Sequence, residues 1–166
     1  MTAIAATGTT GHVAPGPRTI TVHGSAAGFA QEIAIDQHRL RADEPLSVGG
    51  TDTGPTPYDL LLAALGSCTS ITVAMYARRK NWPLDAVTVR MSHSKVHAAD
   101  CAEAETKVGM LDHVHRDVEF IGPLSDEQRA RLLDIASKCP VHRTLESEIV
   151  IETHLTEPDG SGLATS

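Results

Sequence analysis

Residues 56–80 read TPYDLLLAALGSCTSITVAMYARRK, and this stretch decides the fold. Three signals predict that a helix begins here: Thr56 as the N-cap, Pro57 at the first helical position and Asp59 where a capping-box acid reaches back. The eighteen positions from Leu60 to Ala77 contain no charged residue, and three basic residues follow them, where they complement the negative end of the helix dipole. The sequence therefore predicts one long, uncharged helix near the middle of the chain.

An uncharged helix needs apolar cover on every side. About twenty apolar residues can span a bilayer, but this helix has small and polar residues near its middle, which argue against a membrane: Gly66, Ser67, Thr69, Ser70 and Thr72. One sheet and one further helix can hardly surround it in a chain of 166 residues. We therefore expect a homodimer in which a second copy of the chain covers the helix.

The flanking sequence predicts an α+β fold. A second helix is expected from the capping-box pattern at 125–128 to about Cys139, because the residue before Pro140 is disfavoured in a helix. The order β-β-α-β-β-α-β favours helices on one side of an antiparallel sheet, with 97–112 as a long connection. Five runs have the pattern of strands: 19–23 and 32–36 as a hairpin, then 86–93, 114–121 and 148–154.

Length and composition suit one domain with two tails. A chain of 166 residues can bury about 70% of its unfolded surface without a disulfide or metal. We expect a flexible tail at 1–17, a single domain at 18–156 and a second tail at 157–166. The start of the chain lacks the basic and apolar segments of a secretory signal, and three cysteines form no disulfide framework, so a cytoplasmic location is expected.

The charge balance excludes several classes of partner. Fourteen basic against 21 acidic residues give a net charge of −7, which argues against a protein that binds a phosphate backbone. Two phenylalanines, two tyrosines and one tryptophan are too few for stacking on single-stranded nucleic acid. No nucleic acid and no membrane is therefore expected among the partners.

The three cysteines differ in their expected surroundings. Cys68 lies three turns into the uncharged helix among apolar neighbours, where a thiol is either an inert core residue or a reactive one. Cys139 is expected in the last turn of the second helix, where the dipole disfavours a thiolate but the chain can move. These positions suggest an attacking and a resolving thiol. Cys101 lies in a polar connection, where both metal ligation and a plain surface thiol are conceivable.

Four segments together resemble the OsmC/Ohr family, which comprises osmotically inducible proteins and organic hydroperoxide resistance proteins. The resemblance spans about residues 18–156 and implies the OsmC-like fold, an intertwined homodimer whose two long helices are sandwiched between sheets built from both chains. The segments are 43–45 (DEP), 49–57 (GGTDTGPTP), 59–68 (DLLLAALGSC) and 139–145 (CPVHRTL).

The resemblance implies a thiol peroxidase that needs no bound cofactor or metal. Cys68 matches the peroxidatic position and Cys139 the resolving one. Its substrate would be a small organic peroxide, which the apolar neighbours of Cys68 favour, and an external dithiol would reduce the resulting disulfide.

Family members active on peroxides also use an arginine from the N-terminal region and a glutamate just before the central helix. Arg39 and Arg41 are the candidates for the arginine, and they share a face if this segment is extended. The glutamate position is Tyr58 here, and the nearest acid is Asp59. A cation is required because the helix dipole fades within the first turn and cannot ionise a thiol three turns further on.

Two other functions remain open on sequence grounds. One is acyl transfer by Cys68 with His142 as the base, although no oxyanion loop accompanies these residues. The other is a dimeric stress-response module of the same family whose thiols are structural or redox-sensing, which Tyr58 in the glutamate position favours.

Overall fold

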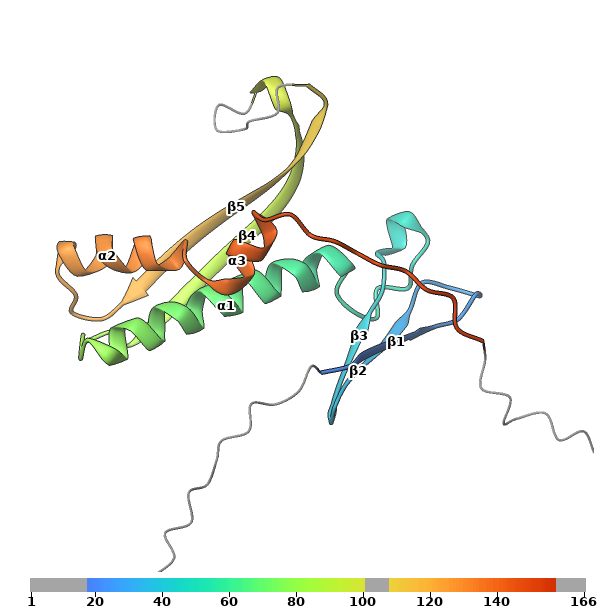
Figure 1. The fold of residues 1–166 in the computed structure, drawn as a ribbon, viewed down its shortest axis with the longest axis horizontal. Helices are drawn as coiled ribbons and strands as arrows, with labels where there is room; N and C mark the ends of the chain where they lie inside the picture. The colour runs from blue at the N-terminus through green and yellow to red at the C-terminus, as the bar shows by residue number, and fades with distance from the viewer. Residues whose placement is uncertain (1–17, 101–107, 158–166) are drawn as a thin grey trace, which may run out of the picture. The chain divides into compact units, whose positions relative to one another are not determined.

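The computed structural model describes residues 18–100 and 108–157 (Figure 1). The chain forms two compact units, Met1–Leu60 and Leu61–Ser166. Cys101, the tail predicted at 1–17 and all but the first residue of the tail predicted at 157–166 lie outside the described residues.

The N-terminal unit contains a three-stranded antiparallel sheet in the order β1-β2-β3. Strands β1 (Ile20–Gly24) and β2 (Gln31–Ile35) form the predicted hairpin, with Ile20 opposite Ile35. Strand β3 (His38–Ala42) was not predicted: Leu40 and Ala42 alternate with two arginines, but no glycine or proline separates this segment from the second strand. A tight turn at Asp36, which has a positive φ of 50°, reverses the chain before it.

The loop between β3 and the long helix is organised by the buried carboxylate of Asp43, which is 1% exposed. Its Oδ2 accepts hydrogen bonds from the Thr51 backbone and hydroxyl (3.1 and 2.6 Å) and from those of Thr53 (3.1 and 3.0 Å). Its Oδ1 accepts one from the Glu44 N–H at 2.8 Å. At Gly50 a Cβ atom would overlap the Glu44 carbonyl, so this position requires glycine. One carboxylate therefore fixes the loop that precedes the helix.

Replacing Asp43 by Asn should lower the Tm by about 5 °C or more, because the amide cannot accept every hydrogen bond that the carboxylate accepts. The hydroxyl of Thr51, followed by the N–H of Thr53, holds the pKa of Asp43 well below its ordinary value. The carboxylate therefore stabilises the fold fully at pH values above about 3.9, the pKa of an aspartate in the unfolded chain. This stabilisation is lost progressively as the pH falls below that value. Thermal unfolding at several pH values measures both effects.

Asp52→Asn is the matched control, since it removes one charge from an exposed side chain of the same loop. We expect the difference in Tm between Asp43→Asn and the wild type to shrink below about pH 4, and Asp52→Asn to show no such convergence. If the Tm of Asp43→Asn stayed below that of the wild type by the same amount from about pH 7 down to about pH 3, the assigned role of the carboxylate would be contradicted.

The long helix α1 runs from Pro57 to Arg79, as predicted. The Leu61–Ser166 unit continues with the antiparallel strands β4 (Ala86–His97) and β5 (Met110–Ile121) and helices α2 (Asp126–Ala136) and α3 (Pro140–Leu145) (Figure 1). Its core joins α1 and α2, and partly buried side chains of β4 and β5 pack against it. The buried core residues are Val73, Ala77, Leu124, Leu132, Ile135 and Ala136.

Three predictions about this unit were wrong. The long connection is shorter than 97–112, because β4 continues to its last residue His97 and β5 begins at Met110. Helix α2 ends at Ala136, and Cys139 is the N-cap of the short helix α3 rather than part of the last turn of α2. The segment 148–154 forms no strand, because no neighbouring strand in the described residues pairs with its backbone.

Helix α1 is covered along one stripe only. Its buried residues recur every fourth position, at Leu65, Thr69, Val73 and Ala77. Ile71 and Met75, on other faces, are 59% and 65% exposed. By length and composition α1 is the one described helix that could cross a membrane, a test that the core helix of a soluble protein also passes. The expectation that a second copy of the chain covers these faces of α1 stays a prediction.

Candidate functional site

The Cys139 sulfur lies in a fully buried position with two polar neighbours, and its residue is 0% exposed. It accepts a hydrogen bond from the His142 N–H, with 3.3 Å between nitrogen and sulfur. It also lies 3.6 Å from the Thr69 hydroxyl oxygen on α1, an interaction in which either group can donate. Cys139 therefore packs against the residue that directly follows Cys68.

The N-cap position changes the electrostatics expected for Cys139. At the predicted helix C-terminus, backbone carbonyls would face the sulfur and disfavour a thiolate. The structure instead directs the N–H of His142 at the sulfur, as in an N-cap of α3. Such a donor favours a negative charge on sulfur. The reason for expecting this cysteine to be mobile does not hold, because the residue is enclosed rather than part of a frayed helix end.

The Thr69 hydroxyl joins three elements. It donates to the Leu65 carbonyl within α1 at 2.8 Å and accepts a hydrogen bond from Nη1 of Arg116 at 3.1 Å. The same guanidinium nitrogen donates to the Ala136 carbonyl at the end of α2, at 3.3 Å. Arg116 therefore connects β5 to both helices, and its partner Thr69 is the residue whose hydroxyl contacts the Cys139 sulfur.

Neither Arg116 nor Thr69 was among the predicted site residues. Arg116 lies on β5, two residues before Val118 and four before Phe120, and these three half-buried side chains share a face of the strand. An arginine in line with core residues needs a polar partner inside the protein. This pattern is the sequence signal that could have identified it.

Cys68 is half-buried in the middle of α1. Its carbonyl accepts a hydrogen bond from the Thr72 hydroxyl at 2.7 Å. The apolar neighbours predicted for it are present, but only Leu65 among them is buried, whereas Ile71 and Met75 are exposed. Successive helix residues point about 100° apart, so the Cys68 and Thr69 side chains leave α1 in different directions. The structure brings the Cys139 sulfur against Thr69, the residue that follows Cys68 in the sequence.

Asp59 has a structural task at the start of α1. Its Oδ2 accepts hydrogen bonds from the Thr56 N–H at 2.9 Å and from the Thr56 hydroxyl at 2.8 Å, and its own N–H donates to that hydroxyl oxygen at 3.2 Å. This is the predicted capping box. The Thr56 hydroxyl, followed by its N–H, keeps the pKa of Asp59 below its ordinary value. A catalytic role for Asp59 stays a prediction, and neighbouring Tyr58 is 50% exposed.

Arg39 and Arg41 lie two residues apart on β3, so they share a face of that strand, as expected. The Arg39 guanidinium donates to the carbonyls of Asp36 and His38, at 2.7 and 2.9 Å. Arg41 is opposite Glu32 in the sheet register. Both arginines belong to the N-terminal unit, and their action on Cys68 stays a prediction.

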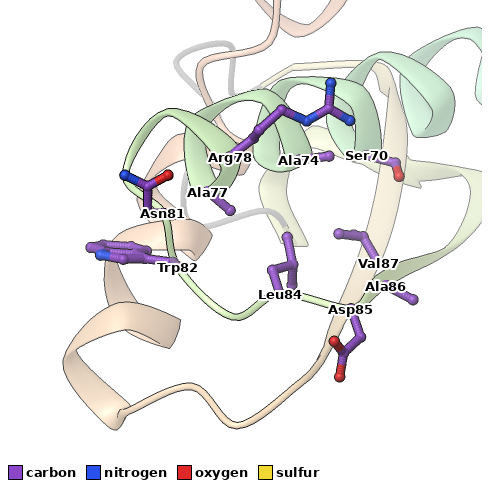
Figure 2. Close-up of a pocket in the computed structure, with 10 residues that line it drawn as sticks. All are labelled: Ser70, Ala74, Ala77, Arg78, Asn81, Trp82, Leu84, Asp85, Ala86 and Val87. Atoms are coloured by element: carbon purple, nitrogen blue, oxygen red, sulfur yellow. The ribbon is translucent and has the colours of Figure 1, made fainter.

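A separate hollow of about 480 Å³ lies at the C-terminal end of α1 and the start of β4 (Figure 2). Figure 2 shows Ala77, Leu84 and Val87 around its middle, with Arg78 and Asp85 pointing away from each other at opposite sides. No cysteine lines it. Within residues 18–100 and 108–157 there is also no cluster of three or more side chains suited to a metal ion.

The model of the OsmC family, described as OsmC-like protein, matches residues 50–154. This match covers more than half of the chain, and the chain therefore belongs to the OsmC-like family. Its α+β architecture of antiparallel sheets and helices is the OsmC-like fold, which confirms the fold class predicted from the sequence. No curated protein sequence matches the chain.

Solved structures agree with this fold. An OsmC-like protein from Mycoplasma pneumoniae has a TM-score of 0.61 at 21% identity, covering 78% of this chain and 87% of its own. An organic hydroperoxide resistance protein OsmC from Legionella pneumophila has a TM-score of 0.59 at 18% identity, with 80% and 91% covered. The organic hydroperoxide resistance protein OhrB of Bacillus subtilis has a TM-score of 0.54 at 21% identity, with 77% and 89% covered. At these identities the likeness establishes the fold.

Proposed function

We propose that the protein is a thiol peroxidase that reduces organic hydroperoxides with Cys68 as the peroxidatic and Cys139 as the resolving cysteine. The observation that carries this proposal is the contact of the buried Cys139 sulfur with Thr69, the residue after Cys68. Membership of a family with hydroperoxide resistance proteins among its structural relatives supports the same activity.

In the first step the Cys68 thiolate attacks one oxygen of the hydroperoxide. A sulfur–oxygen bond forms and the O–O bond breaks, which leaves Cys68 as a sulfenic acid and releases an alkoxide that takes a proton to become an alcohol. A cation near the breaking bond stabilises the departing oxygen, and such electrostatic stabilisation is worth about 10² to 10³ in rate. Arg39 and Arg41 are the candidates for this cation.

In the second step Cys139 condenses with the sulfenic acid. A disulfide bond forms, the sulfur–oxygen bond of Cys68 breaks, and the oxygen leaves as water. An external dithiol then reduces the disulfide by exchange, passing through a mixed disulfide. The enzyme returns to its starting state with one peroxide reduced and one dithiol oxidised, so no cofactor is required.

The experiment that tests this function mixes the reduced protein with cumene hydroperoxide or tert-butyl hydroperoxide and a dithiol, and follows both peroxide and dithiol. We expect catalytic loss of both reagents in a one-to-one ratio. Loss of the dithiol without loss of the peroxide would show that the protein does not use hydroperoxide as its oxidant.

We propose that the active form is a cytoplasmic homodimer. Helix α1 exposes apolar side chains on its uncovered faces, and the segment after α3 exposes further ones: Ile149 at 53%, Val150 at 78% and Ile151 at 83%. A second copy can bury both surfaces and pair the free backbone of 148–154. Sedimentation equilibrium should give twice the chain mass of 17.6 kDa. A monomer at micromolar concentration would contradict this assembly.

The non-catalytic module is the second candidate, and Tyr58 in place of the family's glutamate favours it. The peroxide assay separates the two, because a redox-sensing thiol reacts once whereas an enzyme turns over. The acyl-transfer alternative has less support, since His142 meets a cysteine through its backbone N–H, and that cysteine is Cys139 rather than the proposed nucleophile Cys68.

A further inference from the structure

We propose that Arg116 is a positioning residue for Cys139, acting through the Thr69 hydroxyl to prepare the buried sulfur for attack on Cys68. This inference rests on the proposed pairing of the two cysteines and deepens it by giving β5 a part in the resolving step. Arg116, Thr69 and Cys139 all belong to the Leu61–Ser166 unit.

The Thr69 hydroxyl can serve both protonation states of Cys139. A hydroxyl has one proton and two lone pairs. One lone pair receives the N–H of Arg116, and the proton goes to the Leu65 carbonyl, which leaves the second lone pair for a Cys139 S–H donor. When the sulfur is a thiolate, the hydroxyl can turn and donate its proton to the sulfur instead.

The Arg116 guanidinium strengthens this second arrangement. It carries a permanent positive charge and is one hydrogen bond away from the group that faces the sulfur. A hydroxyl that accepts from a cation becomes a stronger donor, because linked hydrogen bonds polarise one another. The charge is half-buried on β5, so salt screens it less than a surface charge.

The same side chain also holds the backbone that leads to Cys139. Its Nη1 donates to the Ala136 carbonyl at the end of α2, three residues before Cys139. One guanidinium nitrogen therefore fixes the hydroxyl on α1 and the end of α2 together. This double contact sets the separation of the two segments that carry the reacting sulfurs.

Burial makes these protein donors important. Because Cys139 is 0% exposed, water cannot replace a donor that is lost. Among residues 18–100 and 108–157, the donors that face its sulfur are the His142 N–H and the Thr69 hydroxyl. Weakening the donor at Thr69 should slow every reaction in which Cys139 is the nucleophile. This holds whatever group activates Cys68.

A reaction without peroxide isolates this step. In a Cys101→Ser background, Cys68 attacks dithiobis(nitrobenzoate) and releases one coloured thiolate as a mixed disulfide forms on its sulfur. The Cys139 thiolate then attacks the Cys68 sulfur of that mixed disulfide, which forms the Cys68–Cys139 disulfide and releases the second coloured thiolate. Stopped-flow absorbance separates the two releases, and Cys139→Ser should retain the first and lack the second.

Matched pairs of variants test the assignment. We expect Thr69→Val and Arg116→Gln to slow the second release about tenfold, because each weakens one charge-assisted contact. Both variants should leave the rate of the first release unchanged. Thr69→Ser keeps the hydroxyl and Arg116→Lys keeps the charge, so both should retain most of the rate. Arg90→Gln is the control, since it removes an exposed arginine on β4 that pairs with Glu119.

The proposal would be overturned if the second release in both Thr69→Val and Arg116→Gln were as fast as in the wild type. Equal slowing in Arg116→Lys and Arg116→Gln, accompanied by equal losses of Tm, would also overturn it and assign Arg116 a purely structural role. Absence of the second release in the wild type would refute the cysteine pairing itself. A protein that gives both releases with dithiobis(nitrobenzoate) but consumes no hydroperoxide would disprove the proposed function. The role of Arg116 would then still stand.

Discussion

Serine in place of Cys68 is expected to abolish catalytic peroxide reduction, leaving only the background reaction of the dithiol. A serine hydroxyl is a poor nucleophile without a general base, whereas an ordinary thiol is already a few per cent thiolate at pH 7. The half-buried position of Cys68 suits this chemistry, because the residue keeps some solvent exposure in the middle of α1. Initial rates with tert-butyl hydroperoxide at a fixed dithiol concentration measure the effect.

Cys101→Ser is the control for this substitution, since it removes a thiol that does not belong to the proposed pair. We expect it to turn over at the wild-type rate. Full activity of Cys68→Ser would refute the peroxidase assignment. Activity lost equally in both variants would show that Cys101 is also required and would contradict a mechanism that uses only Cys68 and Cys139.

Serine in place of Cys139 is expected to preserve the first turnover and then to inactivate the enzyme within a few further ones. Without a resolving thiol, the sulfenic acid on Cys68 persists and reacts with a second peroxide to give the irreversible sulfinic acid. Mass spectrometry of Cys68 after each addition of peroxide should show the mass of two added oxygen atoms. The wild type should show the intramolecular disulfide instead.

The inactivation of Cys139→Ser should depend on the ratio of peroxide to dithiol, because a dithiol in large excess can reduce the sulfenic acid directly. Raising the dithiol should therefore slow inactivation in this variant and leave the wild type unaffected. A Cys139→Ser protein that turns over indefinitely with scarce dithiol would contradict the resolving role. The contact of Cys139 with Thr69 would then serve packing alone.

Local patterns in the sequence predicted the parts of the fold that depend on local interactions. Helix α1 and the capping boxes at Thr56 and Ser125 formed as expected, because each is determined by residues within one turn. Strand β3 was missed because no glycine or proline marks the turn that separates it from β2, although Leu40 and Ala42 alternate with arginines. The predicted strand at 148–154 failed for the converse reason, since its pattern is right but the described residues offer it no neighbour.

The same distinction applies to the site. The sequence identified Cys68 and Cys139 because cysteines are rare and their flanking motifs resemble a known family. It placed Cys139 at the wrong end of a helix, because the break after Ala136 and the new start at Pro140 were treated as a single ending. The link from Arg116 through Thr69 depends on the packing of β5 against α1, which sequence spacing does not encode.

The enclosure of Cys139 also bears on chemical selectivity. A sulfur without solvent contact is protected from oxidants and alkylating reagents that diffuse freely. It is therefore not oxidised or alkylated before the resolving step. Alkylation of the reduced native protein by iodoacetamide should accordingly modify fewer thiols than the three cysteines of the chain until the protein is denatured. In the proposed mechanism this enclosure leaves the oxidised Cys68 as the one reaction partner of the Cys139 sulfur.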